Sequence, residues 1–413
     1  MRILLGVHQF FPYHYTGTER YVLNLAKQLQ RMGHFVKVLT YSVMDEDGFS
    51  EGFSSGMLYK EYVYEGIPVM AVRHKEKPSD HTFCFDLIDT GFYNETRNLF
   101  LKDKYDMYHC AHPFRISASI KAARDSGVRI TFMVTDYWLM CPLGIMRRAD
   151  NTICEGPDEG RNCLKYCFAH LTEESMRQRI AASRSLIESC DCLLSPSKFL
   201  IELFKENHFI PPDRFVLSRH GFDYTKKKYH ALKETKNPIV FGYIGTIQYH
   251  KGVHIMVEGF KKTRNKNVRL QVWGGCFNEI DYQRNLMETA KGDARIEFKG
   301  SYNFNDAEDI LKPIDVVIVP SIWYENAPLT ISTSLAYGIP VITSDIGGMK
   351  EMIRDGHNGL TFKVEDPEDL SNKIGTIAES PELIAKFKRN IQYPIRVEDE
   401  AFNTEMIYKQ VLA

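Results

Sequence analysis

The sequence has no long apolar run and no excess of charge of either sign. No stretch approaches the roughly 18 apolar residues that a helix needs to cross a bilayer. Its apolar opening, MRILLGV, is interrupted by His8 and Gln9 before a signal-peptide core could form, so we expect a first β-strand there. The formal net charge of -1 gives no reason to expect a nucleic-acid partner. We therefore expect a cytoplasmic protein that rests at most on the inner face of the cell membrane.

Internal repeats and low-complexity tracts are also absent from the sequence. Its 413 residues exceed the roughly 250 to 300 at which a single hydrophobic core stops growing. The composition, 44% hydrophobic and 25% charged, is typical of a soluble globular protein. Two domains are therefore the starting expectation.

Short β-branched segments alternate with amphipathic segments from end to end. This order predicts an α/β protein with two Rossmann-like, doubly wound parallel sheets that face each other across a cleft. In the first half we expect strands at residues 3–7, 35–40, 69–72, 107–109, 130–134 and 193–195, and helices at 19–32, 117–126 and 173–189. In the second half we expect strands at 239–244, 270–273, 296–298, 316–319 and 341–344, with helices beginning near 252, 328 and 367.

A polar, Lys-rich segment without apolar periodicity, residues 224–237, has the composition of an interdomain linker. It separates an N-terminal domain, 1–223, from a C-terminal domain, 238–396. We expect a last helix at 397–413 to complete the N-terminal domain.

The segment richest in chemical signals is PSIWYENAPLTISTSLAYGIPVITSDIGGMKEMIRDGHNGL, residues 320–360. A strand that ends at Pro320 delivers Glu325 to a loop, and Pro328 suits the first turn of the next helix. The free amides of Leu329 and Thr330 would then form an anion site that the helix dipole strengthens. Such a carboxylate and such amides suit the hydroxyls and phosphates of a sugar diphosphate, although a surface Glu that caps a helix would leave the same pattern.

Two further segments contain candidate phosphate-binding groups. In FGYIGTIQYHKGVHIM a strand is followed by Gly245 and Thr246 and then by a helix that opens near Lys251. A lysine at a helix N-terminus is electrostatically unfavourable unless an anion lies there, so Lys251 is a candidate diphosphate clamp. In HYTGTERYVL the loop with Gly17 and Thr18 could bring backbone amides close to phosphate. A plain turn with Thr18 as the N-cap is an alternative.

Two histidines follow the strand expected at 107–109, in the run DMYHCAHPF. His109 would lie at the end of the strand and His112 in the loop beyond it. We favour His112 as the residue that faces a substrate because it precedes a proline in a loop, whereas His109 could be hydrogen-bonded within the core.

Together these segments resemble the glycogen-synthase-like group of retaining glycosyltransferases (group 1, family 4), which have the GT-B fold. The resemblance covers nearly the whole chain, including PSKFL from Pro196 and HGFD from His220. Residues that match the C-terminal pattern of the family are Glu325, Asn326, Pro328, Gly338, Pro340, Val341, Gly347 and Gly348. Three threonines depart from it: Thr16 replaces a glycine, Thr246 an arginine, and Thr333 the glutamate that binds the ribose hydroxyls in the family.

The resemblance implies transfer of a hexose from a nucleoside-diphosphate sugar to a glycan, glycolipid or lipid-linked acceptor, with retention at the anomeric carbon, as in cell-surface polysaccharide synthesis. It gives catalytic roles to Lys251, which stabilises the leaving diphosphate, to Glu325, which positions donor hydroxyls, and to His112, which faces the reacting sugar. The diphosphate itself can accept the proton of the acceptor in this family. The implied donor-binding residues are Gly17, Thr18, Gly245, Thr246, Asn326, Ala327, Pro328, Leu329, Thr330 and Thr333.

We expect no cofactor for catalysis. The run Asp45, Glu46, Asp47 has the Asp-x-Asp form of a metal-binding motif, but it lies in a solvated acidic loop, and we interpret it as surface. The alternatives are a sugar-nucleotide epimerase or a phosphorylase of the same fold, or a sugar-nucleotide-binding protein whose activity has decayed. The threonines at 246 and 333 favour the last of these.

Cysteines cluster in the stretch between residues 141 and 167, at Cys141, Cys154, Cys163 and Cys167. In a reduced protein, four thiols in a short polar segment could bind a structural zinc ion. An iron-sulfur cluster and four unligated thiols are the alternatives.

Overall fold

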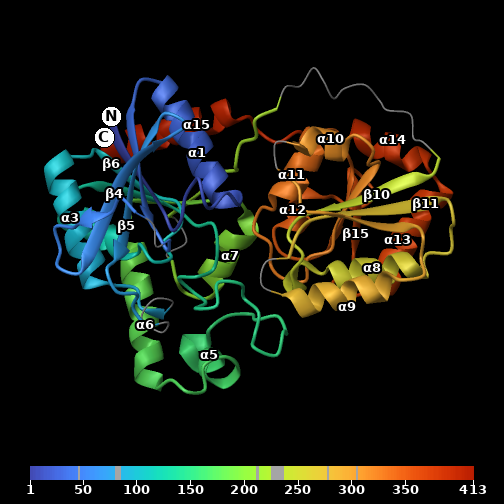
Figure 1. Cartoon of the computed structure of the whole chain (residues 1–413), viewed down its shortest axis with the longest axis horizontal. Helices are drawn as coiled ribbons and strands as arrows, with labels where there is room; N and C mark the ends of the chain where they lie inside the picture. Colours follow the sequence, from blue (N-terminus) through green and yellow to red (C-terminus); the bar gives the residue numbers. More distant parts are fainter. Residues whose placement is uncertain (45–46, 80–84, 211–213, 225–236, 277–278, 304–305) are drawn as a thin grey trace. The chain divides into compact units, whose positions relative to one another are not determined.

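The computed structural model describes residues 1–413 apart from 45–46, 80–84, 211–213, 225–236, 277–278 and 304–305. The chain divides into two compact units (Figure 1). Unit 1 comprises Met1–Gly221 and Val397–Ala413, and unit 2 comprises Phe222–Arg396. Most of the expected linker, together with Asp45 and Glu46 of the acidic run, lies outside the described residues.

Unit 1 is built on a sheet that has nine strands in the described part of the chain, in the order β3-β4-β5-β2-β1-β6-β7-β8-β9. The strands are β1 (Arg2–Val7), β2 (Phe35–Tyr41), β3 (Ser50–Glu51), β4 (Met57–Tyr64), β5 (Ile67–His74), β6 (Met107–Cys110), β7 (Arg129–Met133), β8 (Cys192–Ser195) and β9 (Phe215–Leu217). From β5 to β9 all neighbouring strands pair in parallel.

The parallel sheet that the sequence predicts for unit 1 is extended at one edge by antiparallel pairing, where β4 pairs with both β3 and β5. The turn between β4 and β5 consists of Glu65 and Gly66, which both have positive φ, of 46° and 82°. Two residues in this conformation form a tight hairpin turn that matches the twist of the strands. A glutamate rather than the more usual Asn or Asp occupies the first position, which weakens the hairpin signal in the sequence.

Helices flank the sheet of unit 1 (Figure 1). They are α1 (Gly17–Arg31), α3 (Thr90–Asp103), α4 (Ala118–Asp125), α5 (Arg161–Tyr166), α6 (Glu173–Glu188), α7 (Lys198–Glu206) and α15 (Val397–Leu412), with a short 3₁₀ turn η1 (Asp158–Gly160). The C-terminal helix α15 packs against α1. It is tied to unit 1 by the Glu400 carboxylate, which accepts the Gly221 amide at 2.8 Å, and by a 3.0 Å contact between Glu405 and His34.

Unit 2 contains a sheet in which every described pair of strands is parallel, in the order β12-β11-β10-β13-β14-β15. The strands are β10 (Ile239–Ile244), β11 (Val268–Trp273), β12 (Ile296–Gly300), β13 (Val316–Val319), β14 (Val341–Ser344) and β15 (Gly359–Phe362). The helices are α8 (Val253–Lys262), α9 (Ile280–Ala290), α10 (Ala307–Leu311), α11 (Leu329–Ala336), α12 (Met349–Met352), α13 (Pro367–Glu379) and α14 (Glu382–Arg389), and a 3₁₀ turn, η3 (Tyr249–Lys251), precedes α8.

Each sheet has a point where the strand order reverses, and ligands of such folds bind beyond the carboxyl ends of the strands at this point. In unit 1 it lies between β1 and β6, and in unit 2 between β10 and β13. The residues that follow these four strands include His8, His112, Lys251 and Glu325. The topology alone therefore collects the polar residues of each unit at one edge of its sheet.

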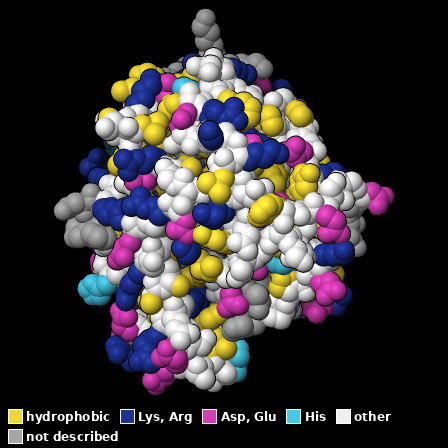
Figure 2. All heavy atoms as spheres, turned by 90° about the vertical axis from the view of Figure 1, so that its left-hand side faces the viewer, with side chains coloured by type: hydrophobic (Ala, Val, Ile, Leu, Met, Phe, Trp, Pro, Cys, Tyr) yellow, Lys and Arg dark blue, Asp and Glu magenta, His cyan; other side chains and the backbone are white. Residues whose placement is uncertain are grey.

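Charges of both signs are interspersed over the molecular face that Figure 2 shows. This distribution agrees with the net charge of -1. Among the described helices, none combines the length and the apolar character that crossing a bilayer requires.

The start of α8 depends on Gly252. This residue has a φ of 68°, and a Cβ atom placed on it would lie 1.9 Å from the carbonyl oxygen of Pro320. The Ile322 amide donates to the His250 carbonyl oxygen at 2.9 Å, so the turn after β10 packs directly on the segment after β13. Only a residue without a side chain allows this close approach.

We expect Gly252→Ala to destabilise unit 2 strongly. The matched control is Gly292→Ala, because Gly292 has a similar φ of 81° but open space around its Cβ position. The left-handed conformation should cost about 1–2 kcal/mol in both variants, and the steric clash at Gly252 about 1–3 kcal/mol more. Urea denaturation followed by tryptophan fluorescence measures the difference. Equal losses in the two variants would show that the contact with Pro320 is unimportant.

Candidate active site

The two polar residues that the sequence places in separate segments of unit 2 form a direct ion pair. The Lys251 ammonium, at the end of η3, lies 2.7 Å from Oε1 of Glu325, in the loop between β13 and α11. The Ser321 hydroxyl donates to the same oxygen at 2.8 Å. The Trp323 ring lies beneath the ammonium, with 5.0 Å between Nζ and the ring centroid.

Glu325 is buried, with 7% of its surface exposed, yet it is held in its ionised form. Burial by itself would raise the pKa of its carboxyl group, but the Lys251 charge and the hydrogen bonds from Lys251 and Ser321 hold that pKa below its ordinary value. The site therefore contains a permanent carboxylate that can accept hydrogen bonds. Its partner Lys251 retains protons for a second acceptor, because an ammonium group has three.

The N-terminus of α11 lies next to the end of β10. The Thr330 hydroxyl, in the first turn of α11, donates to the Ile244 carbonyl oxygen at 3.0 Å. Gly245 and Thr246 follow directly, and a Cβ on Gly274 would come within 1.8 Å of the Gly245 oxygen. Pro328 takes the N-cap position rather than the predicted first turn, which leaves the amides of Leu329 and Thr330 without partners inside the helix.

A pair of glycines fixes the loop that carries Glu325. The Gly348 amide donates to the Glu325 carbonyl oxygen at 2.7 Å, and a Cβ on Gly348 would lie 1.6 Å from the Asn326 oxygen. Gly347 has a φ of 61° and would meet the Glu325 oxygen at 2.8 Å. Thr333 lies one turn further along α11 and is buried.

In unit 1 the loop after β1 leads into α1, whose first turn contains Gly17 and Thr18. The N-cap is Thr16, so the alternative that made Thr18 the N-cap is wrong. The Thr16 hydroxyl does not cap the helix but donates to Oε2 of Glu19 at 2.6 Å. The amides of Gly17 and Thr18 are therefore among those that an α-helix leaves without internal partners.

His112 is fixed by contacts at both ring nitrogens. Its Nδ1 accepts the Phe114 amide at 3.2 Å, and its Nε2 lies 2.9 Å from Oδ2 of Asp136, in the segment after β7. With Nδ1 as acceptor, the proton belongs on Nε2, which then donates to Asp136. The His8 ring lies against that of His112, with 4.0 Å between centroids.

Several polar atoms beside His112 are buried without a hydrogen-bond partner in the described part of unit 1. They are Nδ1 of His8, Nε2 of His14 and Oε1 of Glu19. Burial, followed by the charges of His112, Arg115 and His14, holds the pKa of His8 well below its ordinary value. His8 Nε2 lies 3.7 Å from Glu19. Buried polar atoms normally have partners, so these atoms retain hydrogen-bonding capacity that the described part of the chain does not use.

His109, the alternative to His112, lies in the core of unit 1. Its Nε2 lies 2.9 Å from the Tyr21 hydroxyl and its Nδ1 2.9 Å from the Thr131 hydroxyl. The Tyr408 ring of α15 packs against it, with 5.8 Å between centroids. Burial, and then the charge of His220, lowers the pKa of His109 to about 3. Both ring nitrogens of His109 are therefore hydrogen-bonded within the core. His112, in contrast, lies in the segment after β6, beyond the end of the sheet.

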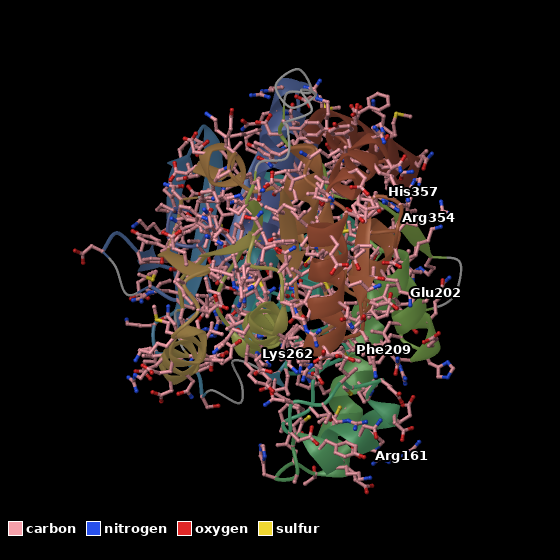
Figure 3. All side chains as sticks on the ribbon, turned by 90° about the vertical axis from the view of Figure 1, so that its right-hand side faces the viewer. Arg161, Glu202, Phe209, Lys262, Arg354 and His357 are labelled. Carbon is pink, nitrogen blue, oxygen red and sulfur yellow. The ribbon has the colours of Figure 1, made fainter. Side chains whose placement is uncertain are left out.

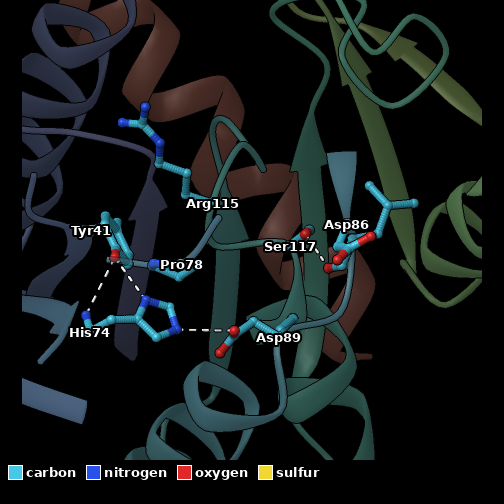
Figure 4. A pocket seen from close by; sticks show the side chains of 9 residues that line it. Tyr41, His74, Pro78, Asp86, Asp89, Arg115 and Ser117 are labelled. Atoms are coloured by element: carbon cyan, nitrogen blue, oxygen red, sulfur yellow. Dashed lines mark hydrogen bonds and ion pairs between the residues drawn. The ribbon is translucent and has the colours of Figure 1, made fainter. Parts of the chain in front are cut away.

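A shallow pocket of unit 1, partly open to solvent, is lined by side chains that include Tyr41, His74, Asp89 and Arg115 (Figure 4). The Tyr41 hydroxyl lies 2.8 Å from Nδ1 of His74, and Nε2 of His74 lies 3.0 Å from Asp89. Arg115 also lines this pocket, and its charge acts on both Tyr41 and His8.

Sequence reasoning missed three residues of these sites. Asp136 and His8 follow the carboxyl ends of β7 and β1, and that position was their only signal. Ser321 precedes Glu325 by four residues in the motif itself and carries no separate signal. The four cysteines of residues 141–167 lie in unit 1, but among the described residues no three potential ligands are grouped as a metal site requires.

Two doubly wound units, each with polar residues at its topological switch point, define a GT-B type of protein. A family model described as "Glycosyltransferase Family 4" matches residues 15–226, and one described as "Glycosyl transferases group 1" matches residues 225–393. The chain therefore belongs to glycosyltransferase family 4 and is a glycosyltransferase of group 1.

Some of the relatives are distant but match almost the whole chain. An uncharacterized glycosyltransferase of Methanocaldococcus jannaschii is 20% identical over 377 residues, which are 90% of this chain and 87% of the relative. The O-antigen chain mannosyltransferase C of Escherichia coli is 19% identical over 396 residues, 94% of this chain and 92% of the relative. Among solved structures, Anabaena HepE in complex with UDP matches with a TM-score of 0.72 at 15% identity, over 99% of this chain and 100% of that one. This likeness shows the GT-B fold.

The buried position of His109 predicts a specific pH dependence of stability. Its folded pKa of about 3 lies below the ordinary value of about 6.5, so the unfolded chain binds the extra proton first as the pH falls. Below about pH 6.5 this histidine should therefore reduce the free energy of unfolding by up to about 1.4 kcal/mol per pH unit. Urea denaturation between pH 7 and pH 5 should show a shallower pH dependence for His109→Gln than for the native protein. Parallel profiles would contradict the assignment.

Proposed function

We propose that this glycosyltransferase transfers a hexose from a nucleoside-diphosphate sugar to a glycan, glycolipid or lipid-linked acceptor in cell-surface polysaccharide synthesis, with retention at the anomeric carbon. The observation that carries this proposal is the Lys251–Glu325 pair beside the N-terminus of α11. It combines a cation, helix amides and a permanent carboxylate at the switch point of unit 2. A sugar diphosphate requires these three kinds of group.

Each group has a role that follows from its chemistry. The amides of Leu329 and Thr330 and the remaining protons of Lys251 stabilise the diphosphate as negative charge develops on the leaving group. Glu325 accepts hydrogen bonds from sugar hydroxyls, and Ser321 keeps its carboxylate oriented. The Glu325 carboxylate also pairs with Lys251. The Lys251 ammonium therefore has to bind Glu325 and the phosphate at the same time, and the affinity for phosphate depends on this sharing.

Unit 1 supplies the acceptor-side groups in this proposal. His112 donates from Nε2 to Asp136 and accepts the Phe114 amide at Nδ1, so both contacts hold the orientation of its ring. The leaving diphosphate then serves as the base for the acceptor hydroxyl, and no protein base is required. The unsatisfied atoms of His8 and Glu19, and the pocket beside Arg115, suit hydroxyls of the acceptor.

The relatives support the donor and the pathway without defining either. Anabaena HepE is bound to UDP in its solved structure, and the Escherichia coli relative is named for O-antigen chains. For this chain we propose a nucleoside-diphosphate hexose and an acceptor of the cell surface. A lipid-linked acceptor would bring the protein to the inner face of the cell membrane.

A thermal-shift panel of nucleoside diphosphates and their sugars tests the donor. A ligand at 100 times its Kd should stabilise the protein by about 2.7 kcal/mol, and the cognate base should stand out. Product analysis then separates the alternatives: transfer or slow donor hydrolysis supports the proposal, and an epimerised sugar nucleotide indicates an epimerase. Binding without any turnover indicates a binding protein whose activity has decayed. If no nucleotide changes the melting temperature, the proposal is wrong.

Turnover should survive EDTA, because Lys251 and backbone amides, rather than a divalent cation, meet the phosphate charge. Initial rates with and without EDTA, measured within minutes of mixing, should agree. Inhibition that is immediate, complete and reversed by magnesium or manganese on mixing would contradict this expectation.

Substitutions of Glu325 and Thr333 test the donor site. Glu325→Gln keeps the shape but removes the charge, so kcat/KM should fall roughly ten- to a hundredfold, the value of a charge-assisted hydrogen bond of about 1.5–3 kcal/mol. Thr333→Ala is the control on α11 and should cost under about 1.5 kcal/mol. Thr333→Glu should tighten nucleotide binding if the pocket admits the longer side chain. A Glu325→Gln enzyme with unchanged kcat and KM would mean that the donor binds elsewhere.

The structure requires a control for folding in this experiment. Glu325 is buried against Lys251, so Glu325→Ala would leave a partly buried cation without its partner, at a cost of several kcal/mol. The double variant Lys251→Met, Glu325→Gln separates stability from catalysis. It should regain stability relative to Glu325→Gln while remaining defective in turnover.

A further inference from the structure

Helix α6 of unit 1 carries a buried arginine. Arg179 is 4% exposed, whereas Arg161, at the start of α5, points outward (Figure 3), with 73% of its side chain exposed. Burial lowers the pKa of Arg179 to about 10, so its guanidinium group remains charged at neutral pH. Because the burial of a charge is costly, an apolar residue would stabilise the fold more if packing were the only role of this position.

The guanidinium group of Arg179 is hydrogen-bonded to main-chain oxygens of two separate segments. Its Nε donates to the Phe85 oxygen at 3.0 Å, and its two terminal nitrogens donate to the oxygens of Leu139 at 3.3 Å and Trp138 at 2.8 Å. The ring centroids of Phe85 and Trp138 each lie 5.2 Å from the central carbon of the guanidinium group. A guanidinium group holds its donors in one rigid plane, so Arg179 fixes both the backbone and the ring of Trp138.

Trp138 contacts both of the groups that orient His112. Its amide donates to Oδ1 of Asp136 at 3.1 Å, and Oδ2 of the same carboxylate lies 2.9 Å from Nε2 of His112. Its ring packs edge-on against the Phe114 ring, with 5.3 Å between centroids, and the Phe114 amide donates to Nδ1 of His112 at 3.2 Å. Contacts of Trp138 therefore connect Arg179 to both ring nitrogens of His112.

The turn after β7 is also held on the other side of Asp136. Thr135 precedes Asp136, and its hydroxyl donates to the Ala111 oxygen at 2.9 Å. This bond attaches the beginning of the turn to the segment after β6 that carries His112. The end of the turn, in contrast, is held at Trp138. The orientation of the Asp136 carboxylate therefore depends on a bond at each side of it.

We propose that Arg179 is a positioning residue for the candidate active site. Through Trp138 it holds Asp136 and Phe114 against His112, and so it fixes the orientation of the His112 ring. The inference rests on the proposed function only for its consequence in turnover, where His112 faces the reacting sugar. Orientation of such a group has a large effect on rate, because a small displacement takes the reacting groups out of alignment.

A ring N–H signal of His112 tests the positioning without any turnover. Arg179→Lys keeps the charge but loses the planar set of donors. Its matched control is Ser183→Ala, because the Ser183 hydroxyl, one turn further along α6, donates to the Leu139 oxygen at 2.5 Å. In protein labelled with ¹⁵N-histidine, the Nε2–H of His112 should give a downfield NMR signal that exchanges slowly with water and is lost in His112→Gln. Exchange should be at least about tenfold faster in Arg179→Lys and unchanged in Ser183→Ala.

Kinetics on the same variants test the consequence for turnover. On the proposed function, kcat of Arg179→Lys should fall at least about tenfold, while the Kd for a nucleoside diphosphate should not change, because the groups of unit 2 are intact. Ser183→Ala should keep the native kcat. Equal losses of kcat in the two variants would show that Arg179 has only a structural role and would overturn the proposal. Faster exchange of the His112 signal with an unchanged kcat would instead contradict the role of His112 in the proposed function and leave the positioning by Arg179 in place.

Hydrogen exchange of the native chain provides a measurement that does not depend on the folding of variants. The amides of Phe114 and Trp138 should exchange through one opening with the same free energy, because their contacts form one unit. Exchange of the Phe114 amide through an opening of its own would overturn the proposal. So would a His112 Nε2–H signal with the same exchange rate in Arg179→Lys as in the native protein.

Discussion

The ion pair between Lys251 and Glu325 is the interaction on which the candidate donor site depends. A carboxylate with 7% exposure would ordinarily take up a proton, because burial disfavours its charged form. The ammonium at 2.7 Å prevents this and leaves both groups charged. The cost is that neither group is fully available, so on the proposed function the sugar donor shares both of them with the ion pair. This compensation suits a site that has to bind hydroxyls and phosphates side by side.

Close backbone packing brings the members of the pair together. Gly252 contacts the Pro320 carbonyl and Gly348 contacts the Asn326 carbonyl, at distances that no Cβ could tolerate. The first contact joins the segments after β10 and β13, and the second joins the segments after β14 and β13, so the loop of Glu325 is held from both sides. The glycines are therefore part of the site although they supply no chemistry, because the ion pair would lose its geometry if either segment moved by the width of a methyl group.

The buried polar groups at the candidate site of unit 1 differ from those of unit 2 in their hydrogen bonding. His112 is oriented by Asp136, while neighbouring atoms of His8, His14 and Glu19 are buried without partners in the described chain. At its candidate site, unit 2 thus pairs the buried Glu325 carboxylate internally, whereas the candidate site of unit 1 contains polar atoms without hydrogen-bond partners in the described part of the chain. On the proposed function, that difference suits a unit that must adapt to the hydroxyls of an acceptor.

The sequence by itself determined the α/β class, most strands and the segments that hold Glu325, Lys251, Gly17 and His112. Strand periodicity, glycines and prolines are local signals, and family motifs are short. Only the tertiary structure decided that Lys251 pairs with Glu325, that Asp136 and His8 join His112, and that β4 pairs antiparallel. Such contacts join residues tens of positions apart, and they depend on strand order and on close backbone packing, which no local pattern encodes.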